Sequence, residues 1–91
     1  EDDTVYAFRD INPMAPVHIL IVPKAHLTSA ADITADNAAL VAHIFAVIPQ
    51  IAAAEGLTNG FRVVTNSGAC QSVPHLHFHL LGGAKMADRM A

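Results

Sequence analysis

The chain has 91 residues, of which 53% are hydrophobic, and its net charge is -3 with only five lysines and arginines in total. A chain of this length forms one small domain, and a domain of this size buries only about 60 to 65% of its unfolded surface, so a partner subunit would add stability. So few basic residues argue against nucleic-acid binding, which needs clustered positive charge on one face. We therefore expect a single domain over residues 1–91 that holds any phosphate locally.

Cysteine content and hydropathy bear on the compartment. The only cysteine, Cys70, cannot form an intramolecular disulfide, so we expect a reducing, cytoplasmic environment. No apolar run approaches the roughly 18 residues that a membrane span needs, and no signal-like segment opens the chain. The chain begins at Glu1 and passes almost at once into strand-like sequence, so we also expect a truncated N-terminus.

The first half of the chain predicts two strands and a helix. Residues 4–9 combine aromatic and β-branched residues, and residues 17–22 are β-branched with a proline at each end. Apolar residues then recur at helical spacing from Thr34, a suitable N-cap, to a stop at Gly56. Pro49 lies inside this helix, where it removes one backbone hydrogen bond and predicts a kink.

The second half predicts two more strands. Residues 61–66 form a third strand, and residues 66–71 form a loop of small residues. Residues 72–81 alternate histidine with apolar residues, so three histidines share one face of this strand: His75, His77 and His79. The expected fold is α+β, an antiparallel sheet of about four to five strands with one main helix packed on its apolar face.

Three imidazoles in a row indicate chemistry at phosphorus. Same-face neighbours on a strand lie about 6.6 to 6.8 Å apart. Two imidazolium charges at about 7 Å repel by roughly 2 kcal/mol at an effective dielectric of about 20, so some of the rings are neutral near pH 7. A neutral imidazole is a competent nucleophile, and a neighbouring ring can donate a proton to a leaving group.

Other interpretations of these residues stay open at this point. The histidines could be hydrogen-bonded polar residues without a catalytic role, or two of them could bind zinc together with His18 or His26. No acidic residue or cysteine flanks the run to support a metal. The loop that ends at Gln71 and Ser72 could aim N–H groups and a hydroxyl at an anion, or it could be an ordinary hairpin connection.

Two segments carry a resemblance to a known family. Residues 71–83, QSVPHLHFHLLGG, resemble the signature of the histidine-triad (HIT) superfamily, and residues 8–26, FRDINPMAPVHILIVPKAH, are similar to its first two strands. The resemblance covers residues 5–83. The Gly82-Gly83 ending resembles the Hint branch of histidine-triad nucleotide-binding proteins more than the dinucleoside polyphosphate hydrolases. The loop over residues 66–71 is shorter than usual in that branch, and Cys70 replaces a glycine.

The resemblance implies the catalytic roles. His77 would be the nucleophile and would form a nucleotidyl-histidine intermediate. His79 would contact the phosphate and help the leaving group, while His75 would support His77 through hydrogen bonding. His18 would in turn support His75. Ser72 would touch the phosphate and the scissile bridge.

The resemblance also implies a nucleotide site. Asp10 would bind the ribose hydroxyls, Ile11 and Leu20 would line the base pocket, and no metal or cofactor would be needed. The implied nucleotide-binding residues are Asp10, Ile11, Leu20, Asn66, Gln71, Ser72, Val73, His77 and His79. Without the resemblance, Asp10 and Asn66 would also suit turns, and Ile11 and Leu20 would suit a core. The family pattern makes His26 structural, and His43 is expected on the surface or at a dimer interface.

The function implied is hydrolysis of a purine nucleoside phosphoramidate, or of an acyl or aminoacyl adenylate, to the nucleoside monophosphate. The resemblance also implies a homodimer in which the helix and the third strand pair with their two-fold mates. Two alternatives share the fold: a dinucleoside polyphosphate hydrolase, and a non-catalytic nucleotide-binding or scaffold protein.

Overall fold

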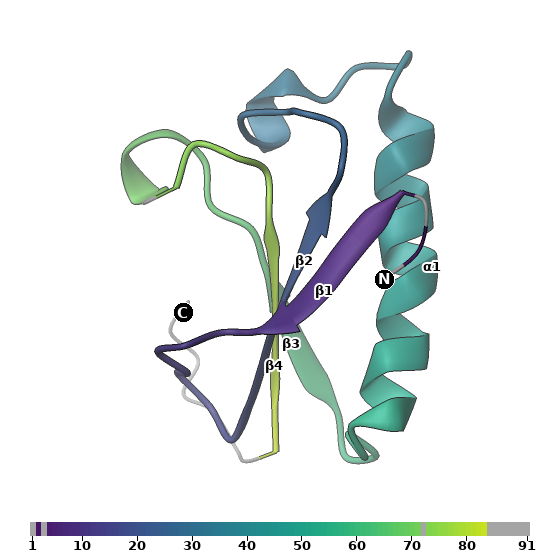
Figure 1. The fold of residues 1–91 in the computed structure, drawn as a ribbon, viewed down its shortest axis with the longest axis vertical. Helices are drawn as coiled ribbons and strands as arrows, with labels where there is room; N and C mark the ends of the chain where they lie inside the picture. Colours follow the sequence, from purple (N-terminus) through teal and green to yellow (C-terminus); the bar gives the residue numbers. More distant parts are fainter. Residues whose placement is uncertain (1, 3, 72, 84–91) are drawn as a thin grey trace.

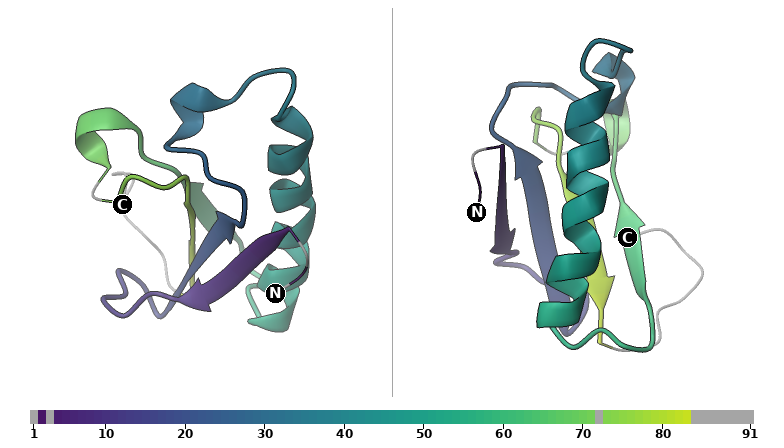
Figure 2. Two further views of the ribbon diagram at one scale, coloured as in Figure 1. Left: turned by 45° about the horizontal axis from the view of Figure 1, so that its top comes forward. Right: turned by 90° about the vertical axis from the view of Figure 1, so that its right-hand side faces the viewer.

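The computed structural model describes residues 2, 4–71 and 73–83, which form an antiparallel sheet with one long helix on one of its faces (Figures 1 and 2). The sheet has four strands in the order β1-β2-β4-β3, which confirms the expected fold class. The strands are β1 (Val5–Arg9), β2 (Val17–Pro23), β3 (Phe61–Val64) and β4 (Phe78–Gly82), and the helix is α1 (Ala38–Ala54). Within the described residues, no helix is both long and apolar enough to cross a membrane.

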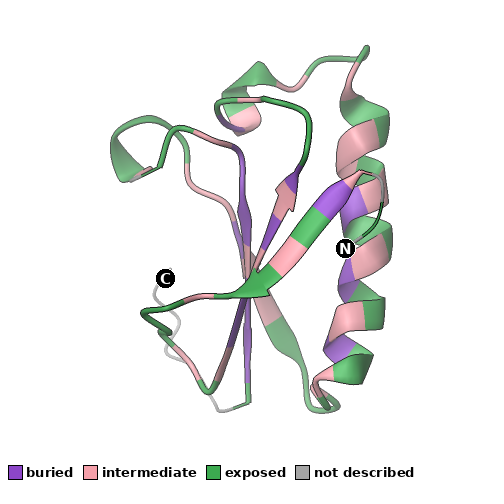
Figure 3. Cartoon of the chain, viewed as in Figure 1, coloured by how far each residue is buried: buried purple, intermediate pink, exposed green. Residues whose placement is uncertain are grey.

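The core lies between α1 and the sheet. Ile44 and Ile48 are one helical turn apart and both are buried, so they form the stripe of α1 that packs on the strands. Figure 3 shows the buried residues of α1 on the side toward the sheet. The core cluster consists of Val5, Ile19, Ile21, Ile44, Ile48, Leu76, Phe78 and Leu80.

The opposite face of the sheet carries the polar residues. Because side chains alternate along a strand, residues between the core positions of β2 and β4 point away from α1. Leu20 lies opposite His79 in the β2–β4 ladder, and His18 lies two residues from Leu20 on the same face. This face therefore brings histidines from two strands together.

The helix and the third strand are shorter than the sequence predicted. The helix begins at Ala38 with Asn37 at its N-cap, so the prediction that Thr34 caps it is wrong. Thr34 instead accepts a hydrogen bond at Oγ1 from the Asp36 N–H, and its own N–H donates to Asn37 Oδ1, which stabilises a turn before the helix. Pro49 lies inside α1 as expected, and β3 ends at Val64.

The predicted histidine strand is also shorter than expected. It was expected over residues 72–81, but β4 begins at Phe78, so His75 and His77 precede the strand. The residues before β4 make other backbone hydrogen bonds instead of ladder pairs. The His75 N–H donates to the Val73 carbonyl at 2.8 Å, and the Leu76 N–H donates to the Leu27 carbonyl at 2.6 Å. The chain bends at residues 73–75, so the alternation predicted a strand correctly only from Phe78 onward.

Candidate active site

Two adjoining cavities are lined by residues of this helix-free face. The larger has a volume of about 490 Å³ and a mainly apolar lining that includes Phe8, Ile11, Leu20, Val22 and Val73. The second has a volume of about 430 Å³ and a more polar lining that includes Asn12, Met14, His18, Asn66 and His79. Asp10 and His77 line both cavities, so His77 stands where the two meet. Both volumes suit a small organic ligand.

The His77 ring has a defined protonation pattern. Its Nδ1 lies 2.7 Å from the main-chain carbonyl oxygen of His75, and a carbonyl can only accept a hydrogen bond. We therefore assign the proton of the neutral ring to Nδ1, which leaves the lone pair on Nε2. The residue is only 9% exposed. His77 thus has an unprotonated Nε2, the form in which an imidazole can act as a nucleophile, and it lines both cavities.

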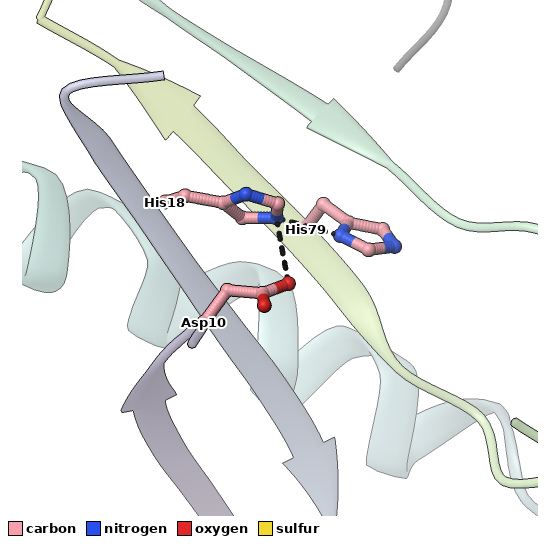
Figure 4. Close-up of side chains that lie close together, drawn as sticks. All are labelled: Asp10, His18 and His79. Carbon is pink, nitrogen blue, oxygen red and sulfur yellow. Dashed lines mark hydrogen bonds and ion pairs between the residues drawn. The ribbon is translucent and has the colours of Figure 1, made fainter. Parts of the chain in front are cut away.

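A chain of hydrogen bonds assigns the protons of the other two rings. The Met14 N–H donates to His18 Nδ1 at 3.0 Å, so the proton of neutral His18 lies on Nε2. That Nε2–H faces His79 Nδ1 at 2.8 Å and makes it an acceptor. The proton of neutral His79 is therefore on its Nε2, which points away from His18 in Figure 4. The site holds a nucleophilic nitrogen on His77 and an N–H donor on the adjacent His79, with ring centroids 5.1 Å apart.

Electrostatics favour the neutral form of His79 in the free protein. Burial lowers the pKa of His79 below its usual 6.5, positive charge on His77 and His18 lowers it further, and Asp10 opposes the shift. A bound phosphate would change this balance. An anion about 4 Å away stabilises an imidazolium by about 4 kcal/mol at an effective dielectric of about 20, whereas a second imidazolium 5.1 Å away costs roughly 3 kcal/mol. An anionic ligand therefore favours a protonated His79.

We expect the NMR titration of His79 to show both effects. In ligand-free protein its midpoint should lie below 6.5, and saturating AMP should raise it. Because the folded pKa is lowered, the stability that neutral His79 contributes is complete above pH 6.5 and is lost as the pH falls through the folded midpoint. A His77→Gln control removes a ring that lowers the pKa of His79 when it becomes protonated, and should raise the ligand-free midpoint. A ligand-free midpoint at or above 6.5 would contradict the assignment.

Asp10, His18 and His79 are also a possible metal-binding group. Their candidate ligand atoms lie within 4.8 Å of one another, and Asp10 Oδ2 is 3.4 Å from His18 Nε2. The hydrogen bonds do not suit a metal. Nδ1 of His18 already accepts from Met14, so its Nε2 could bind a cation only if that bond broke or the ring became an imidazolate. These three side chains are therefore better suited to share hydrogen bonds with one another than to bind a metal ion.

The expected support of His75 by His18 is wrong. Both ring nitrogens of His18 are engaged by Met14 and His79, and the His75 ring donates from Nε2 to the Pro23 carbonyl at 3.0 Å. His75 does support His77, but through its main-chain carbonyl. The rings of His77 and His79 lie close together, with centroids 5.1 Å apart, although His77 precedes β4.

The remaining nucleotide-binding candidates fall into three groups. Asp10, Ile11, Leu20, Asn66 and Val73 line one or both cavities. Gln71 does not present its groups to an anion as expected: its N–H donates to Gly68, and its side-chain amide donates to the Thr28 and His75 carbonyls. Ser72 lies outside the described residues.

Two contributors were missed at the sequence level. The Met14 N–H orients His18, and the Thr65 hydroxyl donates to the His77 carbonyl at 2.8 Å. A backbone N–H leaves no signal in a sequence. Thr65 was included in a predicted strand, where its hydroxyl suggested no partner.

Other polar side chains lie apart from the junction. The His26 ring packs edge-on against His75, with centroids 5.5 Å apart, and is exposed. His43 on α1 pairs with Asp2, with 2.8 Å between Nε2 and Oδ2. Cys70 is an exposed free thiol in the short 3-10 helix Gly68–Cys70.

Comparisons with known proteins agree with this fold. The family described as HIT domain matches residues 1–86. An uncharacterized HIT-like protein of Synechococcus elongatus is 49% identical over 89 residues, which cover 96% of this chain and 78% of that protein. Adenylylsulfatase HINT1 of Arabidopsis thaliana is 44% identical over 90 residues, which cover 94% of this chain and 61% of that protein. The solved structure of a histidine triad protein from Clostridium difficile matches with a TM-score of 0.94 at 47% identity. The match covers 99% of this chain and 81% of that protein's chain.

Proposed function

Because this chain belongs to the HIT domain family, we propose that it binds a purine nucleoside monophosphate group and hydrolyses a P–N bond to that group, with His77 as the nucleophile. The unprotonated Nε2 of His77 at the junction of the two cavities carries the proposal. The apolar cavity would take the base, with Ile11 and Leu20 in contact with it, and Asp10 would bind the ribose. The more polar cavity would take the leaving group.

The first step transfers the nucleotidyl group to the protein. Nε2 of His77 attacks phosphorus, the P–N bond to the leaving amine breaks, and the electron pair goes to the amine nitrogen. Phosphate binding favours protonated His79, so this ring can give its Nε2 proton to the departing amine. Protonated His79 also carries a hydrogen on Nδ1, which would meet the Nε2–H of His18. The His18 N–H therefore turns to Asp10 when His79 is protonated, since His18 Nε2 and Asp10 Oδ2 are 3.4 Å apart.

The second step releases the product. Water attacks phosphorus, and its proton goes to Nε2 of His79, which is neutral after the first step. The bond between phosphorus and His77 breaks, which frees the nucleoside monophosphate and returns both rings to their starting states. An acyl adenylate would give the same nucleotidyl-His77 intermediate with a carboxylate as the leaving group. This carboxylate leaves without a proton, so His79 would release its proton to solvent before it accepts one from the attacking water. The Arabidopsis relative is named an adenylylsulfatase, which supports an adenylyl group as the unit bound.

Hydrolysis of several substrates in the presence of a chelator tests the proposal. We expect wild-type protein to release the fluorescent amine from an adenosine phosphoramidate, and to do so much faster than it cleaves a diadenosine polyphosphate. Faster cleavage of the diadenosine polyphosphate would assign the dinucleoside polyphosphate hydrolase. AMP binding without any turnover would favour a non-catalytic nucleotide-binding or scaffold protein. Loss of activity with the chelator would point to a metal.

We also propose that two copies associate through α1 and β3. α1 has no Asp, Glu, Lys or Arg, and its only polar residues are His43 and Gln50. A surface helix normally carries charged and polar residues on the face opposite the core, so α1 is more apolar than a helix that packs on one sheet alone. Phe45 on α1 is 49% exposed, and Phe61 on β3, the edge strand, is 43% exposed. Pairing of β3 with its two-fold mate would cover both and continue the sheet across the dimer.

Light scattering after size exclusion should report a dimer for the wild type and a monomer for Phe45→Asp, because the new carboxylate would be desolvated in the interface. Tyr6→Asp is the matched control. Tyr6 is 46% exposed on β1, the other edge strand, so this variant should remain dimeric. A monomeric wild type, or a dimeric Phe45→Asp variant, would contradict the proposed interface.

A further inference from the structure

His77 lies at a point where the sheet no longer holds the chain. The β2–β4 register ends with Phe78 opposite Ile21. The β3–β4 pairing begins one residue further along β4, with His79 opposite Val64. His77 is therefore the last residue before β4 begins and is not paired with either neighbouring strand. A nucleophile there needs another anchor, because catalysis requires its nitrogen to stay within a fraction of an ångström of the line of attack.

The Thr65 hydroxyl supplies a hydrogen bond at this position. Thr65 directly follows β3, and its Oγ1–H donates to the main-chain carbonyl of His77 at a distance of 2.8 Å. This bond connects the segment after β3 to the segment before β4, just beyond the last ladder pair of Val64 and His79. The donor is a side-chain hydroxyl and not a backbone N–H. Thr65 is half-buried and is not among the residues that line the two cavities, and its hydroxyl reaches the site through the His77 carbonyl.

The ring and the peptide of His77 are held by different groups. The ring donates from Nδ1 to the carbonyl of His75, which precedes it in the same segment. That bond orients the ring relative to its own segment. The Leu76 N–H and the His75 ring tie the residues before His77 to Leu27 and Pro23. The Thr65 bond ties the His77 peptide itself to the residue after β3, so without it this peptide and its ring can move relative to the cavities.

We propose that Thr65 is a positioning residue for the nucleophile. Its hydroxyl holds the His77 peptide so that Nε2 stays at the junction of the two cavities. This inference rests on the proposed function, because it assigns His77 the nucleophilic role. A purely structural threonine would add stability to the β3 end without any effect on the rate of nucleotidyl transfer.

Substitution by valine tests the role of the hydroxyl, since Thr65→Val keeps the shape of the side chain. We expect its kcat for the phosphoramidate to fall about tenfold with KM within about twofold, because one ordinary hydrogen bond corresponds to a change of that size. Thr65→Ser keeps the hydroxyl and should restore kcat to within about threefold of wild type. Thr58→Val, an exposed threonine in the loop before β3, is the matched control and should leave kcat unchanged.

Several results would overturn the proposal. These are wild-type kcat in Thr65→Val, a loss in Thr65→Ser equal to that in Thr65→Val, and a change confined to KM. Thermal melting of each variant checks folding. If Thr65→Val does not fold, the same comparison is made between Thr65→Ser and Thr65→Ala, and equal kcat values for these two would overturn the proposal.

A measurement without turnover separates this inference from the proposed function. If the wild type hydrolyses no substrate, the proposed function fails, but the positioning role is still testable by NMR of the imidazoles with AMP bound. Thr65→Val should then shift or broaden the His77 signals and leave those of His43, on α1, unchanged. Unchanged His77 signals would overturn the positioning role alone.

Discussion

Replacement of His77 by alanine should reduce phosphoramidate hydrolysis more than any other single substitution in this chain, by more than about 10⁴-fold. Without the imidazole no nucleotidyl-protein intermediate can form, and water would have to displace the amine directly. AMP should still bind, because the base and ribose groups are held by other residues that line the cavities. The rate of fluorophore release and the affinity for AMP, measured on the same preparation with chelator present, test both expectations.

Two further observations sharpen this test. Quenching of the wild type during turnover in alkaline denaturant, which preserves a P–N bond to histidine, should give protein heavier by one nucleoside monophosphate less water, and His77→Ala should give none. His43→Ala is the control, because His43 lies on α1 against Asp2 and outside both cavities. Residual activity above about 1% in a folded His77→Ala protein would show that His77 is not the nucleophile, because it exceeds the expected remainder by about a hundredfold.

The fold could be predicted from the sequence because its elements follow simple periods. The β-branched run between Pro16 and Pro23 became β2, and the apolar spacing that includes Ile44 and Ile48 became α1. The boundaries were less accurate. Alternation of histidine and apolar residues predicts an extended chain, but it does not tell a ladder strand from a segment bound by isolated contacts. The Leu76 N–H bonds to Leu27 in such a segment, so β4 starts late.

The site could be predicted in its residues but not in its pairings. His18 was expected beside His75, yet the register places Leu20 opposite His79, and His18 reaches His79 from the neighbouring position on the same face. Register depends on how whole strands fit together, which a motif of residue types does not contain. The same limit applies to Thr65, whose contact exists only because β3 and β4 separate beside it.

Replacement of His79 by alanine should give the second largest loss, about 10² to 10⁴-fold, which is the usual contribution of a general acid. The loss should be smaller than that of His77→Ala because the covalent path remains open. It should also depend on the leaving group. A departing alkylamine needs a proton and should show the full loss, whereas the carboxylate that leaves an acyl adenylate needs none and should show little.

The comparison of these two substrates in wild type and His79→Ala is therefore the decisive measurement. His18 would lose its ring partner in the variant, but Asp10 Oδ2 lies 3.4 Å from the same nitrogen and can accept a hydrogen bond from its N–H, so the fold should survive. His43→Ala again serves as the control. An equal loss for both leaving groups would mean that His79 stabilises the phosphate charge in both reactions and that the amine takes its proton from another donor.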